Sequence, residues 1–128
     1  MYQIAKRFAF SAAHSLPSLP EDHKCHRLHG HNYEVELVLS AGNELDVHGM
    51  VLDYAALQPF KDWLMATLDH HNLDDFMWRF PDHNSSTAEN LAYRLHDVAL
   101  TVQPELAGRL VAVRVKETAD TWAEYTAT

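Results

Sequence analysis

His29-Gly30-His31 opens a segment in which apolar and polar residues alternate, and this segment places the strongest limit on the fold. The apolar positions are Tyr33, Val35, Leu37 and Leu39, and the polar positions between them are Asn32, Glu34 and Glu36. A period of two is typical of a half-buried strand. It puts both imidazoles on one face, with Gly30 adding no bulk between them, so that the pair can bind one ion. The alternative is an ordinary pair of surface histidines.

Length, charge and cysteine content narrow the class of protein. The 128 residues suit one domain, which we expect to span residues 1–128. The formal net charge is -8 and the basic residues do not cluster, which argues against nucleic acid as a partner. A single cysteine excludes a disulfide framework and favours the cytoplasm. No apolar run has the length of a signal peptide or a membrane span, so we expect no membrane association.

The rest of the chain predicts an α+β fold. Hydrophobic periodicity and turn residues indicate four strands and two helices, at Tyr2–His14, His29–Ser40, Asp53–Leu68, a helix opening at Ser86-Thr87-Ala88-Glu89, Leu110–Glu117 and Thr121–Thr126. Asp53 is the predicted N-cap of the first helix, and Ser86 with Glu89 has the form of a capping box for the second. The stretch from Asp75 to Ser85 reads as a loop. This order predicts an antiparallel sheet with two helices on one face.

A catalytic zinc usually has three protein ligands and one open position. His29 and His31 supply two, and His14 is the best third, because it ends the neighbouring predicted strand on that strand's apolar face. A lone buried histidine is otherwise more often a core residue with its hydrogen bonds satisfied. His23 and His26 compete with His14 for the third position, but a loop offers poorer geometry.

Three further sites carry groups that could react. Cys25 could be a fourth zinc ligand, a small buried residue, or a nucleophile or base whose basic neighbours favour the thiolate. Asp69 could orient His70 as a general acid or base, although adjacent side chains splay apart and a helix end explains the histidine equally well. Glu117 ends an apolar strand and is either solvated or at the rim of a pocket, where it could accept hydrogen bonds from a guanidine-like edge.

Six stretches together resemble the 6-pyruvoyltetrahydropterin synthase family. They occur in family order and are Phe10-Ser11-Ala12-Ala13-His14, Cys25-x-x-x-His29-Gly30-His31-Asn32-Tyr33, Met50-Val51-Leu52-Asp53-Tyr54, Leu68-Asp69-His70-His71-Asn72-Leu73-Asp74, Ser86-Thr87-Ala88-Glu89-Asn90 and Val115-Lys116-Glu117-Thr118. The three residues between Cys25 and His29 resemble the bacterial 6-carboxytetrahydropterin synthases of queuosine (7-deazaguanine) biosynthesis. The animal-type pyruvoyl enzymes typically have a longer gap.

The resemblance implies a role for each candidate residue. Zinc would be bound by the three histidines, Cys25 would be the proton-abstracting thiolate and Asp69 with His70 would complete the relay. Glu117 would hold the pterin ring, with Thr87 nearby. The implied fold is the tunnelling fold, a four-stranded antiparallel sheet with two antiparallel helices on one face. Trimers would close barrels and two trimers would form a homohexamer, with Cys25 of one chain meeting Asp69 and His70 of another.

The implied substrate is 7,8-dihydroneopterin triphosphate, and the implied products are 6-carboxytetrahydropterin, acetaldehyde and triphosphate. Two alternatives stay open at this point: a 6-pyruvoyltetrahydropterin synthase that eliminates triphosphate, and a non-catalytic zinc- or pterin-binding module. They remain because Ala88 replaces a hydroxyl residue common at that position and because the stretch from Phe76 to Asn84 lies outside the shared pattern. These departures bear on specificity.

Overall fold

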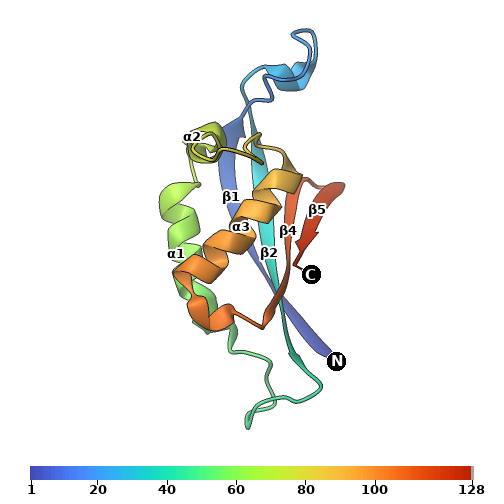
Figure 1. Cartoon of the computed structure of the whole chain (residues 1–128), viewed down its shortest axis with the longest axis vertical. Helices are drawn as coiled ribbons and strands as arrows, with labels where there is room; N and C mark the ends of the chain where they lie inside the picture. Colours follow the sequence, from blue (N-terminus) through green and yellow to red (C-terminus); the bar gives the residue numbers. More distant parts are fainter. Residues whose placement is uncertain (128) are drawn as a thin grey trace.

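The computed structural model describes residues 1–127, which form one sheet with its helices packed on a single face (Figure 1). The strands are β1 (Tyr2–His14), β2 (His29–Gly42), β3 (His71–Asn72), β4 (Leu110–Thr118) and β5 (Thr121–Thr126), in the order β3-β1-β2-β4-β5. The four longer strands are antiparallel neighbours, which confirms the predicted sheet. The two-residue β3 was not predicted; it lies parallel to β1 at the sheet edge.

The structure has the two long helices that the sequence predicts, but each begins at a different residue from the one predicted. The short helix η2 (Tyr54–Leu57) leads into α1 (Gln58–Thr67), and α3 (Ala88–Val102) runs in the opposite direction beside it (Figure 1). Asp53 caps η2, its Oδ1 accepting from the Ala55 amide at 2.9 Å. A five-residue helix that was not predicted, α2 (Leu73–Met77), begins just before the segment predicted as a loop and extends into it. It is too short to show a helical period.

The predicted capping box at Ser86 and Glu89 is wrong by one residue. Thr87 is the N-cap of α3, and its side-chain oxygen accepts from the Asn90 amide at 3.2 Å. Ser86 is fully buried and its hydroxyl is bonded elsewhere. Two adjacent hydroxyl residues fit the same sequence pattern, and burial of the first leaves the second as the cap.

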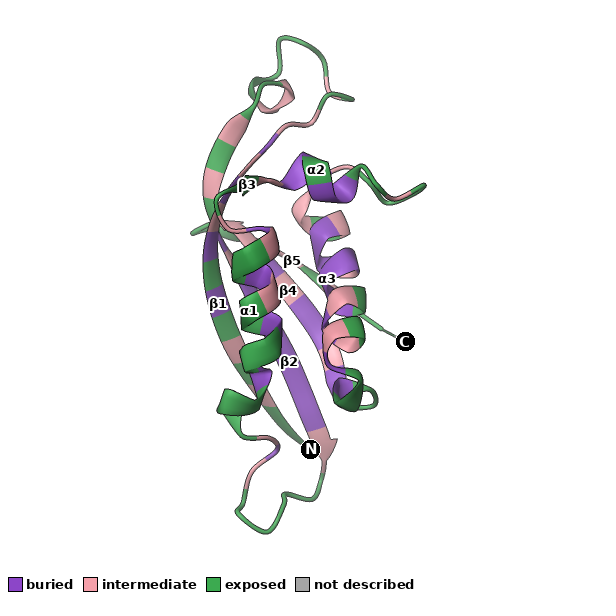
Figure 2. Cartoon of the chain, turned by 90° about the vertical axis from the view of Figure 1, so that its left-hand side faces the viewer, coloured by how far each residue is buried: buried purple, intermediate pink, exposed green. Residues whose placement is uncertain are grey.

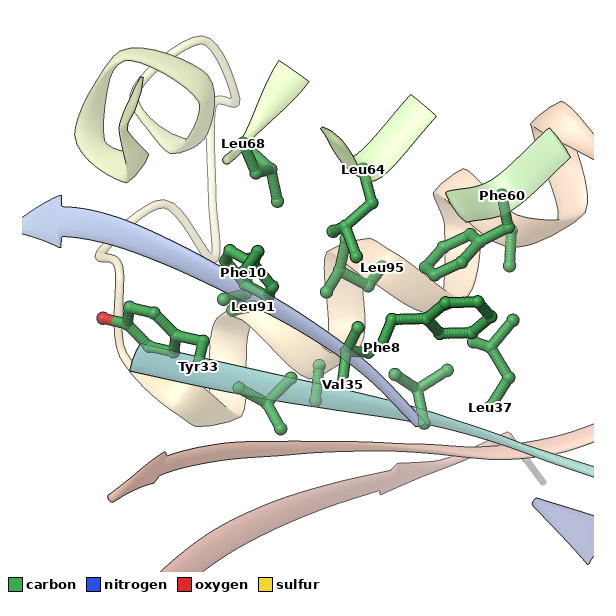
Figure 3. Close-up of a cluster of buried hydrophobic side chains, with 14 of the residues drawn as sticks. Phe8, Phe10, Tyr33, Val35, Leu37, Phe60, Leu64, Leu68, Leu91 and Leu95 are labelled. Atoms are coloured by element: carbon green, nitrogen blue, oxygen red, sulfur yellow. The ribbon is translucent and has the colours of Figure 1, made fainter. Parts of the chain in front are cut away.

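The core fills the space between the sheet and the helices, as Figures 2 and 3 show. Alternate residues of β1 and β2 face α1 and α3, including Phe8, Phe10, Tyr33, Val35 and Leu37 against Phe60, Leu64, Leu68, Leu91 and Leu95. Phe10 stacks on its cross-strand partner Tyr33 with ring centroids 5.2 Å apart. Burial of each large apolar side chain contributes about 1.5–3 kcal/mol. The alternation predicted from the sequence is therefore the pattern that packs the core.

The register of β1 and β2 decides what lies at the end of this core. Phe8 pairs with Val35 and Phe10 with Tyr33, and continuing the register pairs His14 with His29. Because side chains alternate along a strand, His31 lies on the same face as both. None of the helices within the described residues is both long and apolar enough to cross a membrane.

Candidate metal centre

His14, His29 and His31 converge where β1 ends and β2 begins. Their ring centroids are 4.6 to 5.1 Å apart. Each ring offers one nitrogen, and these ligand atoms all lie within 4.8 Å of one another. His14 is fully buried, whereas the side chain of His31 is 22% exposed. The arrangement therefore has a closed inner side and an open outer side, which is the form of a metal site that admits a further ligand.

Two backbone carbonyls orient the rings of His14 and His29. The Nδ1 atom of His14 lies 2.9 Å from the carbonyl oxygen of Ser86, and that of His29 lies 2.7 Å from the carbonyl oxygen of Arg27. A carbonyl accepts only, so each Nδ1 carries the proton and each Nε2 keeps its lone pair. The Nε2 atoms of all three histidines are buried without a hydrogen-bond partner. Unpartnered imidazole lone pairs that face one another fit a bound metal ion.

The charge state of His31 also suits a ligand. Burial lowers the pKa of His31, the nearby Glu117 carboxylate opposes this, and His14 and His29 lower the pKa further. A metal ligand must be the neutral imidazole, because the protonated ring has no free lone pair. The surroundings of His31 therefore favour the form that binds metal.

Glu117 lies against the histidines at the end of β4. Its Oε1 is 3.1 Å from Nε2 of His14 and 3.4 Å from Nε2 of His31, without the alignment of a hydrogen bond. The same carboxylate lines a hollow of about 470 Å³ together with His31, Asn32 and Lys116. Of the two alternatives that the sequence allowed for Glu117, a solvated side chain or one at the rim of a pocket, the structure has the second. It can accept hydrogen bonds from a ligand bound beside the metal.

Cys25 lies away from this group. It is in the short helix η1 (Lys24–His26), within the connection from β1 to β2 that extends beyond the sheet at the top of Figure 1. Within residues 1–127, the ligand set that clusters around one point consists of the three histidines and does not include Cys25. His23 and His26 bond within the same loop, to the Cys25 amide and the Leu19 carbonyl respectively. The loop residues are therefore not the third or fourth ligand within this chain.

Asp69 and His70 contact each other directly, although they are adjacent in sequence. The Nδ1 atom of His70 lies 2.8 Å from Oδ2 of Asp69, and His70 has φ +59°. This left-handed backbone turns the two side chains toward each other and is uncommon for a residue with a Cβ. The Ser11 amide donates to Asp69 Oδ1 at 2.9 Å, and the His70 amide donates to the Ser11 carbonyl at 2.6 Å. The edge of β1 therefore holds the pair in place.

The electrostatics of the pair are those of an ionised carboxylate beside a histidine. The Ser11 amide lowers the pKa of Asp69 most, and the His70 side chain lowers it further. The His70 side chain is 81% exposed and lines a hollow of about 550 Å³ that also includes His31 and Asn72. An exposed imidazole oriented by a carboxylate can exchange a proton with a molecule in that hollow.

Sequence reasoning missed three residues of this region. Ser86 and Asp74 are buried behind His14, and Tyr33 packs edge-on against His14 and His31. The Tyr33 hydroxyl points out of the hydrophobic cluster toward the end of β1 (Figure 3) and has no hydrogen-bond partner. Burial raises the pKa of Tyr33, so the phenol stays protonated. One sign in the sequence indicates that Ser86, Asp74 and Tyr33 belong to the site: all three lie inside the stretches that resemble the family. Thr87, by contrast, uses its hydroxyl as the cap of α3.

Comparisons with known proteins identify relatives over nearly the whole chain. The model of the 6-pyruvoyl tetrahydropterin synthase family matches residues 3–128. The chain is 35% identical over 126 residues to the 6-pyruvoyl tetrahydrobiopterin synthase of Homo sapiens, covering 91% of this chain and 85% of the human protein. It is 34% identical over 119 residues to an Archaeoglobus fulgidus protein provisionally named 6-carboxy-5,6,7,8-tetrahydropterin synthase, covering 91% and 88%. The structure of Caenorhabditis elegans 6-pyruvoyl tetrahydropterin synthase superposes with a TM-score of 0.79 at 29% identity, covering 99% and 96%.

Proposed function

This chain belongs to the 6-pyruvoyl tetrahydropterin synthase family, and from that premise we propose that it is a zinc-dependent 6-carboxy-5,6,7,8-tetrahydropterin synthase. The reaction converts 7,8-dihydroneopterin triphosphate and water to 6-carboxytetrahydropterin, acetaldehyde and triphosphate. The pterin ring gains the electrons that the side chain loses, so no external reductant is needed. We assign the activity to queuosine (7-deazaguanine) biosynthesis because of the spacing between Cys25 and His29, and to the cytoplasm because the chain has a single cysteine.

The observation that carries the proposal is the convergence of three buried, unpartnered Nε2 atoms beside the Glu117 carboxylate. His14, His29 and His31 would hold the zinc. When bound, zinc acts as a Lewis acid that acidifies the hydroxyl groups of the substrate side chain. Glu117 would accept two N–H groups from the edge of the pterin ring, and Thr87 would lie near that ring. A pterin edge offers the same donor pattern as a guanidine group.

Proton transfer falls to the two regions outside the histidine cluster. We assign the Cys25 thiolate as the base that removes a proton from a side-chain carbon, and His70, oriented by Asp69, as the acid that returns one. Because Cys25 is not in the cluster of its own chain, we propose that the complete site forms between chains. The exposed edge strand β5 supports a hexamer of two trimers, since proteins seldom leave such an edge uncovered.

A second candidate is the 6-pyruvoyltetrahydropterin synthase reaction, in which triphosphate is eliminated and no carbon–carbon bond breaks. The relative that favours it is the human protein, whose identity to this chain is as high as that of the archaeal one. Ala88, the first residue of α3, also bears on this choice, because it replaces a hydroxyl residue that could contact the pterin.

The decisive experiment incubates the zinc-loaded protein with 7,8-dihydroneopterin triphosphate. We expect acetaldehyde and 6-carboxytetrahydropterin in equal amounts, detected by an alcohol dehydrogenase assay and by chromatography. Triphosphate release with a pyruvoyl product and no acetaldehyde would assign the second reaction. Zinc binding without turnover of substrate would instead indicate a non-catalytic binding module. Light scattering tests the assembly separately, and a stable monomer at micromolar concentration would contradict the shared site.

A further inference from the structure

A buried carboxylate lies on the Nδ1 side of His14. Asp74, the second residue of α2, is 1% exposed, and both Ser86 and His14 are fully buried beside it. We propose that Asp74 is a positioning residue, which acts through Ser86 and Ser15 to hold His14 in the tautomer and orientation that a bound metal requires. This inference rests on the proposed metal site and adds a residue to it.

The carboxylate contacts the residue that follows His14 in the chain and the residue that the His14 ring contacts. Its Oδ2 accepts from the amide of Ser15 at 3.0 Å and from the hydroxyl of Ser15 at 2.8 Å. Its Oδ1 accepts from the hydroxyl of Ser86 at 2.6 Å. Ser15 follows His14 directly in the chain, and Ser86 contacts the ring. Asp74 therefore fixes the backbone that carries the imidazole and the residue that the imidazole touches.

The direction of these hydrogen bonds sets the tautomer. The Ser86 hydroxyl donates its proton to Asp74 at 2.6 Å, or to the more distant Ser15 carbonyl at 3.3 Å, and both are acceptors only. The Ser86 oxygen therefore accepts from the Nδ1 atom of His14, which lies 3.2 Å away. The carbonyl oxygen of Ser86, at 2.9 Å from Nδ1, is also an acceptor only. Both acceptors require the proton on Nδ1, which leaves the Nε2 lone pair facing His29 and His31. Outer groups of this kind orient a ligand and raise its basicity.

The alternative is that Asp74 only ties α2 to β1 and has no effect on the metal. The two roles predict different results for Asp74→Asn, whose amide has the same shape but offers one acceptor where the carboxylate offers two. A structural tie would lower the thermal stability alone. A positioning residue would also hold Ser86 and the Ser15 backbone less firmly once its charge is lost, and the resulting shift of the His14 ring would lower the affinity for metal.

The test measures zinc affinity by competition with a chromophoric chelator, using wild type, Asp74→Asn and Asp75→Asn. Asp75 is the exposed neighbour on the same helix, so its variant carries the same charge change without the buried contacts. We expect Asp74→Asn to bind zinc about 10- to 100-fold more weakly and Asp75→Asn to bind as wild type does. In the zinc-free proteins, ¹⁵N NMR of the histidine rings should show a weaker hydrogen bond from Nδ1 of His14 in Asp74→Asn and an unchanged one in Asp75→Asn.

Two smaller changes keep the inference testable if Asp74→Asn does not fold. Ser86→Ala removes the hydroxyl and keeps the carbonyl that accepts from His14, and Ser15→Ala removes one of the two bonds to Oδ2. We expect each to weaken zinc binding several-fold, with Ser86→Ala the larger. Zinc affinity within twofold of wild type in the folded variants would overturn the inference. If wild-type protein binds zinc but turns over no substrate, the proposed reaction is refuted, and the comparison of zinc affinities among the variants still tests the role of Asp74.

Discussion

The histidine cluster and the Asp69–His70 pair lie at the same end of the molecule, but the fold holds them differently. The cluster is on the core-facing side of β1 and β2, with His14 buried and two of its rings fixed by backbone carbonyls. The pair lies at the sheet edge, where His70 is 81% exposed and has a left-handed backbone, and its amide donates to the Ser11 carbonyl. Cys25 is in a loop beyond both.

This difference indicates that one chain can form the metal-binding part of the site by itself, whereas the groups that transfer protons lie on exposed segments. A metal site needs several ligands with their geometry fixed in advance, and core packing supplies that rigidity. Groups that exchange protons need access to substrate and can lie on exposed edges and loops. We therefore expect changes in the cluster to remove metal and activity together, and changes in the exposed groups to reduce activity while metal is retained.

The largest effect is expected for His31→Ala. His31 is the partly exposed ligand, so its removal costs less packing than the loss of buried His14 would. We expect zinc content to fall far below one ion per chain and kcat/KM to drop at least about 10³-fold, because the Lewis acid supplies several kcal/mol of stabilisation. Metal analysis and steady-state kinetics measure both. His48→Ala, in an exposed turn, is the matched control and should leave both values unchanged.

The next effect concerns Cys25→Ala, which separates a base from a ligand. If the thiolate is the base, kcat should fall about 10²- to 10⁴-fold while zinc content and oligomeric state stay at the wild-type level. The measurement pairs single-turnover kinetics with metal analysis on the same sample. If zinc is lost in parallel with activity, Cys25 is instead a metal ligand supplied to the histidine cluster of another chain. The distinction between a metal-binding cluster and exposed groups that only transfer protons would then be wrong for Cys25.

A smaller effect is expected for His70→Asn. Asparagine adopts left-handed φ more readily than most residues, so the backbone at φ +59° should be kept while the ring is lost. We expect kcat/KM to fall about 10²-fold and the basic limb of its pH profile to flatten, since no imidazole remains to lose a proton. If the basic limb is unchanged, His70 is not the acid and its role is confined to the turn.

The smallest effect is the acid dependence of stability at Asp69. The Ser11 amide and the His70 side chain lower the pKa of Asp69, so its contribution to folding is complete above the unfolded value of about 3.9 and is lost as pH falls through the lower folded value. In zinc-free protein, the Tm of wild type should exceed that of Asp69→Asn at neutral pH, and the gap should close below about pH 4. Calorimetry from pH 7 to 3 measures the gap, and a constant difference would show that the stabilisation is not ionic.

Most of the fold could be predicted because its elements are long and regularly patterned. β1, β2 and both long helices each bury one face, and that face appears in the sequence as a period of two or of about 3.6. The elements that were missed or misplaced are short or ambiguous. β3 has two residues and α2 has five, and Ser86 and Thr87 are equally good caps until one of them is buried.

The sequence by itself determined that His29 and His31 share a face and that His14 ends an apolar face, because strand side chains alternate with a period of two. Only the tertiary structure decided that His14 pairs with His29, that Glu117 reaches the same point, and that Asp69 and His70 touch. It also placed Ser86, 72 residues from His14 in the chain, where its carbonyl sets the ring's tautomer. Periodicity is a local property, whereas strand register, a left-handed turn and burial of a serine depend on how distant segments pack together.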